Sequence, residues 1–310
     1  MNSKPLVSII VPVYNGSNFM REAIDSALAQ TYDNIEIIVV NDGSTDNTDE
    51  IALSYGDKIR YFQKENGGVS SALNLGIMKM KGEYFSWLSH DDKYFPNKIE
   101  NQINLLAKTN NLRNIAYCDS VRINEKGDML FRSKRNKYLK PGTNSWEESL
   151  TALIKNGCLS GCAFLIPKDA FFDAGFFDEK LKYSQDFLMW INILLKHYAV
   201  VYEPSDGVYI RVHDKQMTNT GSSLFYHDSS VLASLVVDSL STNSSKHYNF
   251  TYYLAVYFAK HLCRDAISII IRENCLTFWQ KISIFFISLY GKIRPILKKI
   301  YLKTIRKERG

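Results

Sequence analysis

The chain has 310 residues, of which 45% are hydrophobic and 23% are charged. This composition is typical of a globular protein with a full core, and it excludes a disordered or fibrous chain. The net charge of +6 belongs to the end of the chain, because residues 292–310 alone carry a net charge of +7. The rest of the chain is close to neutral, which does not favour binding of nucleic acid.

Cysteine usage and the first residues bear on the cellular compartment. The five cysteines are an odd number, and their spacing completes no zinc site. The apolar run at residues 6–13 is too short for a signal peptide, and no small-residue cleavage site follows it. Reduced thiols in a cytoplasmic protein are the simplest interpretation.

Apolar runs alternate with helical patterns along the chain, which predicts a doubly wound, mostly parallel α/β sheet with helices on both faces. Strands are expected at residues 7–12, 35–40, 59–63, 84–88, 115–123, 129–132, 161–167 and 208–213. Helices are expected at residues 19–30, 69–80, 96–108 and 146–155, from Ser44 or Thr45 to about residue 55, and from Asp186 onward. Residues 132–145 are basic and polar, and we expect them to form a mobile loop over the acceptor side.

Polar residues follow each of the first four predicted strands. They are Tyr14 and Asn15, Asn41 and Asp42, Asn66 and Gly67, and Asp91 and Asp92. Ligands of open α/β sheets bind beyond the carboxyl ends of the strands, so we expect these residues to form one site. The sequence contains neither a glycine-rich dinucleotide motif nor a P-loop, which leaves a metal ion as the natural counter-charge for phosphates. The alternative for Asp91 and Asp92 is a solvated turn that caps the next helix.

These motifs resemble the nucleotide-sugar domain of family-2 inverting glycosyltransferases over roughly residues 5–215. The resemblance rests on four segments in matching order and spacing: residues 8–15, residues 41–46, Asn66 with Gly68, and the pair Asp91 and Asp92. It implies a GT-A fold, a UDP-sugar donor and a divalent cation, Mn²⁺ or Mg²⁺.

The resemblance also implies roles for single residues. Asp42 is expected to bond the uracil ring, Asp91 to lie on the ribose side, and Asp92 to bind the metal. Asp186 is expected to be the catalytic base, and His213 to reach the metal or the diphosphate. The remaining implied substrate-binding residues are Pro12, Tyr14, Asn15, Asn66, Gly68 and Arg211.

The chain departs from the family pattern at several positions. Leu73 stands where the family often has an arginine, so His213, Arg211 or a lysine is expected to supply the missing cation. Ser89 replaces the first carboxylate of the Asp-x-Asp-Asp pattern, although Asp91 and Asp92 are kept. Gln185 replaces the glutamate that usually precedes the catalytic aspartate.

Asp186 and His213 each have a structural alternative. Asp186 precedes an apolar helical pattern, where an aspartate can serve only as a helix cap. An inverting transfer nevertheless needs a carboxylate that takes the proton of the attacking hydroxyl group. His213 follows the last predicted strand, and a histidine there can simply be a satisfied loop residue.

The prediction divides the chain into a nucleotide-sugar-binding half (1–115), an acceptor-binding half (116–220) and a helical C-terminal extension (221–310). Residues 276–290 are nearly all apolar or aromatic, but they are shorter than the roughly 20 residues that span a bilayer. With the basic tail behind them, they predict an amphipathic helix on the membrane surface. The alternative is a core or oligomer helix with a solvated basic end.

The sequence therefore predicts a metal-dependent inverting hexosyltransferase, peripheral on the cytoplasmic face of the inner membrane. It would move a sugar from a UDP-sugar to a hydroxyl group of a surface polysaccharide or a lipid-linked glycan. A catalytically inactive nucleotide-sugar-binding protein of the same fold is the alternative, for which Leu73 and Gln185 are the hints. A nucleotidyltransferase would need a glycine- and arginine-rich triphosphate loop, which the sequence lacks. The donor sugar, the acceptor, the linkage and the oligomeric state stay open.

Overall fold

The structure is a computed structural model. It describes residues 4–133, 136–156, 159–214 and 216, and further on only 228–229, 231–235, 255–258, 266–267 and 284. Contacts divide the chain into two compact units, residues 1–222 and 223–310. The described stretches of the second unit are helical and bury apolar side chains such as Leu232, Ala255 and Phe258.

The first unit is built on one mixed sheet with the strand order β3-β2-β1-β4-β9-β6-β10-β5, in which β7 pairs with β6 and β8 with β10. The strands are β1 (Val7–Val13), β2 (Ile35–Asn41), β3 (Arg60–Gln63), β4 (Tyr84–Trp87), β5 (Lys93–Tyr94), β6 (Asn114–Ile123), β7 (Met129–Arg132), β8 (Gly142–Thr143), β9 (Phe164–Pro167) and β10 (Ala199–Arg211). Strands β1 to β4 are mutually parallel, as are β6 and β10. Strand β9 runs antiparallel to both β4 and β6 and joins the two parallel groups. The predicted α/β class and mostly parallel sheet are confirmed.

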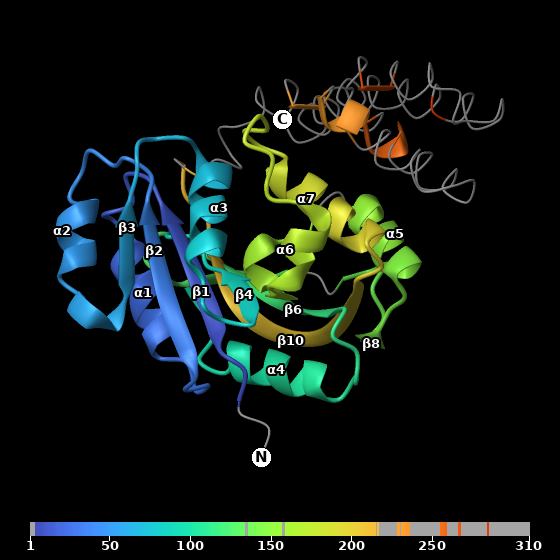
Figure 1. Cartoon of the computed structure of the whole chain (residues 1–310), viewed down its shortest axis with the longest axis horizontal. Helices are drawn as coiled ribbons and strands as arrows, with labels where there is room; N and C mark the ends of the chain where they lie inside the picture. The colour runs from blue at the N-terminus through green and yellow to red at the C-terminus, as the bar shows by residue number, and fades with distance from the viewer. Residues whose placement is uncertain are drawn as a thin grey trace, which may run out of the picture. The chain divides into compact units, whose positions relative to one another are not determined.

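Helices cover both faces of this sheet, as Figure 1 shows for α3, α6 and α7 on one face and α4 on the other. The helices are α1 (Met20–Leu28), α2 (Thr48–Leu53), α3 (Val69–Lys79), α4 (Lys98–Ala107), α5 (Trp146–Asn156), α6 (Asp169–Ala174) and α7 (Gln185–Leu195). Short 3₁₀ turns occur at Gly56–Lys58 and Gly161–Ala163. Helix α3 packs on β1 and β2, and α4 packs on β6 and β10.

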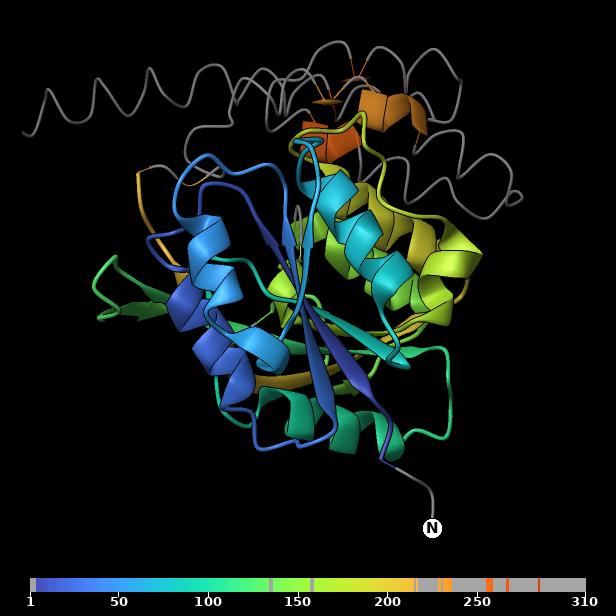
Figure 2. The ribbon, with the colours of Figure 1, turned by 60° about the vertical axis from the view of Figure 1, so that its left-hand side comes forward.

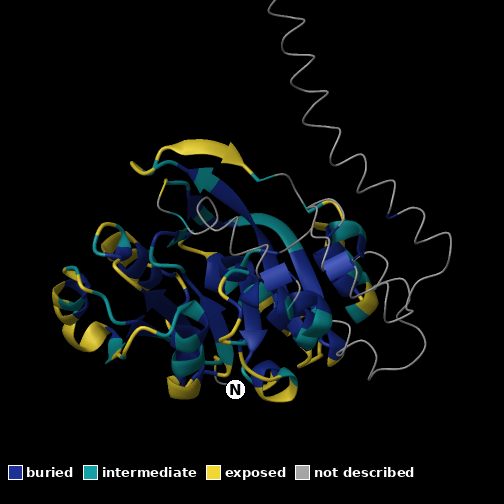
Figure 3. Ribbon diagram, turned by 90° about the horizontal axis from the view of Figure 1, so that it is seen from above, coloured by how far each residue is buried: buried dark blue, intermediate teal, exposed yellow. Residues whose placement is uncertain are grey.

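The core lies where β1 is covered from both sides, and all seven residues of this strand are buried. Such a continuous apolar run is typical of central parallel strands. Gly76 allows α3 to lie directly on β1, because a Cβ atom at this position would be 2.5 Å from Cγ2 of Ile10. The burial pattern is visible in Figure 3.

Several local predictions differ from the structure. The second helix begins at Thr48 and not at Ser44 or Thr45, so the predicted cap is wrong. The hydroxyl oxygen of Ser44 instead accepts a hydrogen bond from the backbone N–H of Asn15, and the Asp46 carboxylate accepts from the N–H and hydroxyl of Thr48. Strand β5, helix α6 and the first half of β10 were not predicted. The predicted strand at 161–167 begins as a 3₁₀ turn.

Among the described residues, no helix is long and apolar enough to cross a membrane. Apart from Ile284, residues 276–290 lie outside the described part of the chain. The amphipathic surface helix therefore stays a prediction.

Candidate active site

The loop after β1 is bound to the loop after β2. Asn15 has a positive φ of 48°, and its side-chain oxygen accepts a hydrogen bond of 2.8 Å from the backbone N–H of Thr45. The backbone N–H of Gly16 donates to the hydroxyl of Thr48 at 3.1 Å. Pro12 is buried in β1, whereas Tyr14 is half exposed beside Asn15. The structure thus holds an aromatic side chain open to solvent next to a fixed polar loop.

Asp42 lies at the end of β2 and organises the loop that precedes α3. Its Oδ1 accepts hydrogen bonds from Nζ of Lys64 at 2.7 Å and from the N–H of Gly67 at 3.0 Å. Its Oδ2 accepts from the N–H of Gly68 at 2.7 Å. Gly68 has a φ of 90°, a conformation that favours glycine. These bonds use three of the about four acceptor positions of the carboxylate, and Asp42 is buried.

Asn66 lies in the same loop and is exposed. A Cβ atom on Gly43 would be 2.7 Å from the backbone nitrogen of Asn66, so the loops after β2 and β3 are in direct contact. Asn66 and Gly68 therefore lie beside Asp42, at the sheet edge that the sequence predicted.

The acidic pair follows β4 and meets the end of β10. Oδ2 of Asp91 and Nε2 of His213 are joined by a hydrogen bond of 3.0 Å. Oδ1 of Asp92 accepts a hydrogen bond of 2.9 Å from the backbone N–H of Arg211. The structure thus brings Asp91, Asp92, Arg211 and His213 together from two distant parts of the sequence.

Arg211 lies beneath this pair, and its side chain has 0% exposure. Its Nε donates to the carbonyl of Asp91 at 2.9 Å, and Nη2 pairs with Oε2 of Glu22 at 3.0 Å. Nη1 donates to the carbonyls of Asn124 and Glu125 at 3.3 and 2.6 Å. The predicted contact of Arg211 with substrate stays a prediction. This geometry gives the side chain a positioning role for the loop of Asp91 and Asp92.

Two further residues of the Arg211 cluster were not predicted from the sequence. Glu22 on α1 binds both Arg211 and Lys93. Phe19 packs against both the Arg211 guanidinium and the His213 ring, with centroid distances of 4.4 and 5.3 Å. Only the spacing of Phe19 and Glu22 within a helical pattern was visible in the sequence, and it predicts no partner.

Burial and like charge dominate the electrostatics of the pair. Burial, together with the neighbouring Asp91 carboxylate, raises the pKa of Asp92 well above its usual range. The thiol of Cys162 lies 3.4 Å from Oδ2 of Asp92, and its pKa is raised by burial and by that carboxylate. Burial also lowers the pKa of His90. Burial and like charge therefore disfavour the simultaneous ionisation of both carboxyl groups.

The segment before α7 is bound to α3, which begins at the Asp42 loop. The Asn74 side chain donates to the carbonyl of Phe177 at 3.0 Å and accepts from the N–H of Phe177 at 2.9 Å. The hydroxyl of Ser70 donates to the carbonyl of Asp178 at 3.1 Å. Nζ of Lys182 lies 3.8 Å from the position that a Cβ atom on Gly68 would take. The chain that leads to Asp186 is thereby held beside the nucleotide-side loops.

Asp186 is the second residue of α7 and is partly buried. One of its carboxylate oxygens accepts a hydrogen bond of 2.8 Å from the N–H of Phe187. This contact is also that of a residue at a helix N-terminus, so the role as a catalytic base stays a prediction. Leu73 stands where the family often has an arginine. It is completely buried and packs in the core. Lys64 and Lys182 are the lysines that the structure brings to the Asp42 loop.

The donor atoms of the acidic pair suit a hard divalent cation. Mg²⁺ is commonly held by one or two carboxylates together with substrate phosphates, and carboxylate oxygens also suit Mn²⁺. The raised pKa of Asp92 also fits a place where added positive charge is favourable. Within the described ranges, no three His, Cys, Asp or Glu side chains are grouped to hold a metal ion by themselves. The remaining ligands of a cation at this place would come from water or from substrate phosphates.

The strand order and the polar edge define the class of the domain. Of the solved structures, that of S. aureus TarS 1–349 in complex with UDP-GlcNAc superposes with a TM-score of 0.67 at 18% sequence identity, covering 83% of this chain and 72% of that TarS chain. This likeness shows the fold, which is the predicted GT-A fold.

The sequence comparisons identify the family. The family described as glycosyl transferase family 2 matches residues 8–178. An uncharacterised glycosyltransferase of Rickettsia typhi is 55% identical over 219 residues, which cover 70% of this chain and 67% of that protein. A similar glycosyltransferase of Rickettsia felis is 54% identical over 218 residues, but the match covers only 35% of its length. The chain belongs to glycosyl transferase family 2.

Proposed function

We propose that this protein transfers a sugar from a UDP-sugar to an acceptor hydroxyl group with inversion at the anomeric carbon. The observation that carries the proposal is the connection of the Asp42 loop to the segment before Asp186, through the hydrogen bonds of Asn74 and Ser70 with Phe177 and Asp178. This connection supports a cleft that has a nucleotide-binding side and a proton-accepting side. The UDP-GlcNAc complex of TarS supports a nucleotide-sugar donor.

We propose a role for each residue of the site. In this proposal the remaining acceptor site of Asp42 bonds the uracil N–H, and the exposed ring of Tyr14 contacts the base. Asp91 lies on the ribose side, while Lys182 contributes positive charge near the diphosphate. Asp92 would hold Mn²⁺ or Mg²⁺ with His213 as a second group near the ion, and the cation would supply Lewis-acid stabilisation of the leaving diphosphate.

Asp186 takes the proton of the attacking hydroxyl group. The hydrogen bond from the N–H of Phe187 to one carboxylate oxygen helps to orient this carboxylate at the start of α7. A positioned general base typically contributes a factor of about 10² to 10⁴ to the rate.

The test replaces Asp186 by Asn. We expect turnover to fall about 10² to 10⁴-fold, while the affinity for UDP stays within about twofold, because the amide keeps the shape but accepts no proton. Isothermal titration and a UDP-release assay measure the two quantities. Asp178→Asn is the matched control, since its carboxylate bonds only the nearby N–H of Lys180 among the described contacts. Unchanged turnover of Asp186→Asn contradicts the role as a base.

We further propose that the acceptor is a surface polysaccharide or a lipid-linked glycan, and that residues 276–310 attach the enzyme peripherally to the cytoplasmic face of the membrane. The apolar and basic composition of this segment supports attachment. Removal of residues 276–310 should reduce sedimentation with vesicles of anionic lipid. If the shortened chain sediments as before, the attachment lies elsewhere.

A further inference from the structure

Strand β7 exposes three consecutive apolar side chains. Met129, Leu130 and Phe131 have exposed fractions of 65, 50 and 58%. Successive side chains of a strand point to opposite faces, so neither face of β7 is covered. Antiparallel strands in contact with water normally alternate apolar and polar residues, and an uninterrupted exposed apolar run indicates an interaction site. Figure 3 shows β7 exposed along its length.

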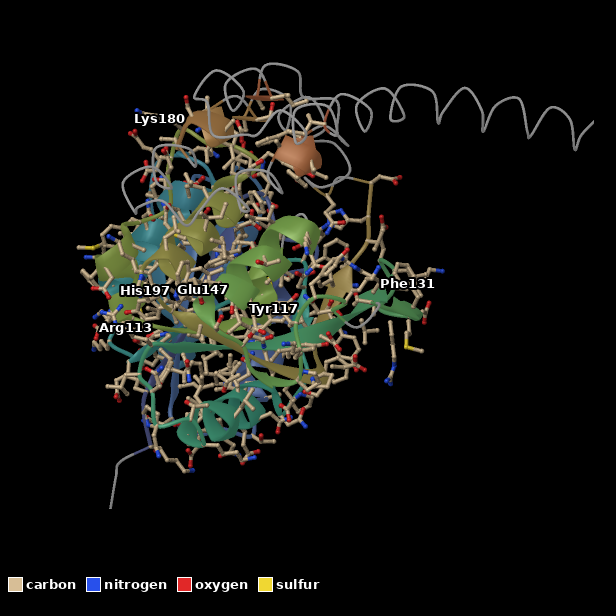
Figure 4. All side chains as sticks on the ribbon, turned by 90° about the vertical axis from the view of Figure 1, so that its right-hand side faces the viewer. Arg113, Tyr117, Phe131, Glu147, Lys180 and His197 are labelled. Atoms are coloured by element: carbon tan, nitrogen blue, oxygen red, sulfur yellow. The ribbon has the colours of Figure 1, made fainter. Side chains whose placement is uncertain are left out.

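The hairpin that carries these residues is well defined. Strand β7 pairs with β6 alone within the described part of the sheet, and its outer edge is open. The side chain of Asn124 closes the turn, because its Oδ1 accepts hydrogen bonds of 2.9 Å from the backbone N–H groups of Lys126 and Asp128. Figure 2 shows the hairpin extending beyond the rest of the sheet, and Figure 4 shows Phe131 at its outer edge.

Positive charge follows the apolar run directly. Residues 129–146 contain five basic residues and no acidic residue. Of these five, Arg132, Lys137 and Lys140 are exposed, and two (134 and 135) lie outside the described residues. Arg132 is paired with Asp206 at 3.1 Å and Lys140 with Glu148 at 2.6 Å, so both side chains are held near the surface of the domain.

We propose that the β6–β7 hairpin and a basic segment, formed by the exposed residues Arg132, Lys137 and Lys140, dock on an anionic lipid surface. Apolar side chains on both faces of a strand need an apolar phase around them, which an interfacial bilayer region provides and a hydrated glycan does not. Adjacent lysine and arginine side chains match the charge of anionic headgroups. The apolar triplet and the basic segment together therefore fit a lipid surface.

Docking through this hairpin also bears on the reaction. Its turn carbonyls, at Asn124 and Glu125, accept the Nη1 hydrogen bonds of Arg211, which in turn holds the loop of Asp91. A lipid-bound hairpin fixes the distance between the acidic pair and the membrane, where a lipid-linked acceptor would present its hydroxyl group. This consequence rests on the proposed function, whereas docking itself does not.

The first experiment measures vesicle binding of the full chain. Leu130→Asp combined with Phe131→Asp should lower the affinity for phosphatidylglycerol-containing vesicles at least tenfold, and all variants should bind neutral phosphatidylcholine vesicles weakly. Leu53→Asp is the matched control, because Leu53 on α2 is 62% exposed and lies outside the hairpin. Since all three positions are exposed, the melting temperatures should remain unchanged. A double variant that binds like the wild type overturns the proposal.

The second experiment reads the hairpin directly and is independent of the C-terminal tail. Phe131→Trp should show an emission blue shift and quenching by brominated acyl chains beyond those of the wild type, and Leu53→Trp should show neither. A Phe131→Trp spectrum that vesicles leave unchanged overturns the proposal. The proposal is also overturned if the wild type is a dimer and the double aspartate variant is a monomer with unchanged vesicle affinity. That result would mean that β7 of the wild type pairs with a second copy of the chain. Both measurements need no turnover, so they separate docking from the proposed transferase activity.

Discussion

Arg211 illustrates how one buried side chain organises a site. Its guanidinium is removed from water and is compensated by the carbonyls of Asp91, Asn124 and Glu125 and by the carboxylate of Glu22. A buried charge is tolerated only when it is paired and hydrogen-bonded in this way. Its backbone N–H meanwhile holds the carboxylate of Asp92. The acidic pair is therefore positioned by β10 as well as by β4.

Lys98 is a second buried cation, and it is 1% exposed in the core. Its Nζ donates to the hydroxyl of Ser86 at 2.8 Å and to the carbonyl of Phe164 at 3.2 Å, and it lies 4.2 Å from the ring centroid of Tyr94. Burial lowers the pKa of Lys98 to about 8. Through these contacts Lys98 joins α4 to β4 and β9, and each group that it contacts is uncharged.

Lys98 should make the stability of the domain depend on pH. The unfolded chain keeps the ammonium proton up to a pKa of about 10.4, whereas the folded state loses it near pH 8, so the unfolded state binds more protons between these values. The free energy of unfolding of the wild type should therefore rise with pH in this window, relative to Lys98→Met, by on the order of 3 kcal/mol. Urea unfolding of both proteins at several pH values measures this difference.

The comparison with Lys98→Met isolates one group. Cys118, whose pKa is raised to about 12 by burial, titrates in both proteins and cancels. Stability curves that run parallel from pH 7 to 10.5 would mean that Lys98 keeps its ordinary pKa.

At the scale of elements, the sequence predicted what depends on local pattern. Asp42, Asn66 and Asp91 were found because they follow apolar strands, and the carboxyl ends of parallel strands meet at one edge. The short α6 and β5 were missed since neither is long enough to establish a period. The first half of β10 was missed although Val200 and Val201 favour a strand, because the irregular pairing around Asp206 interrupts the alternation.

Contacts between elements far apart in sequence were beyond prediction. The pairing of Glu22 with Arg211 spans most of the domain, and no spacing rule applies to it. The same holds for Asn74, which joins α3 to residues 177–179. Such contacts depend on which elements pack together in the folded domain. The polar residues that form them follow no periodic pattern in the sequence.

The Asn74 contacts lead to a prediction for the segment before α7. Asn74→Asp keeps the acceptor for the N–H of Phe177 but loses the donor to its carbonyl and adds repulsion against Glu179. We expect a loss of about 1–3 kcal/mol in the free energy of unfolding and faster hydrogen exchange at residues 177–184. Met78→Ala on the exposed face of α3 is the control. Exchange at residues 177–184 that equals the wild-type rate would show that Asn74 does not hold this segment.

At the scale of the whole molecule, charge and architecture are separated along the chain. The sheet, its helices and every site residue from Pro12 to His213 lie in residues 1–222. The strongly basic end lies in the second unit, beyond residue 291. Nucleotide binding and the basic tail are therefore expected to be separable functions.

This separation predicts that a chain ending at Ser222 folds and binds UDP. The first unit has its own continuous core, from the buried β1 to α7, so removal of the second unit should leave a cooperative thermal transition. The Kd for UDP, measured by titration in the presence of Mn²⁺, should stay within about threefold of that of the full chain. Asp42→Asn serves as the control in both lengths, because it weakens the bonds from Lys64, Gly67 and Gly68 that shape the loop. Loss of cooperative unfolding or of UDP binding in the shortened chain alone would mean that the second unit completes the core or the site.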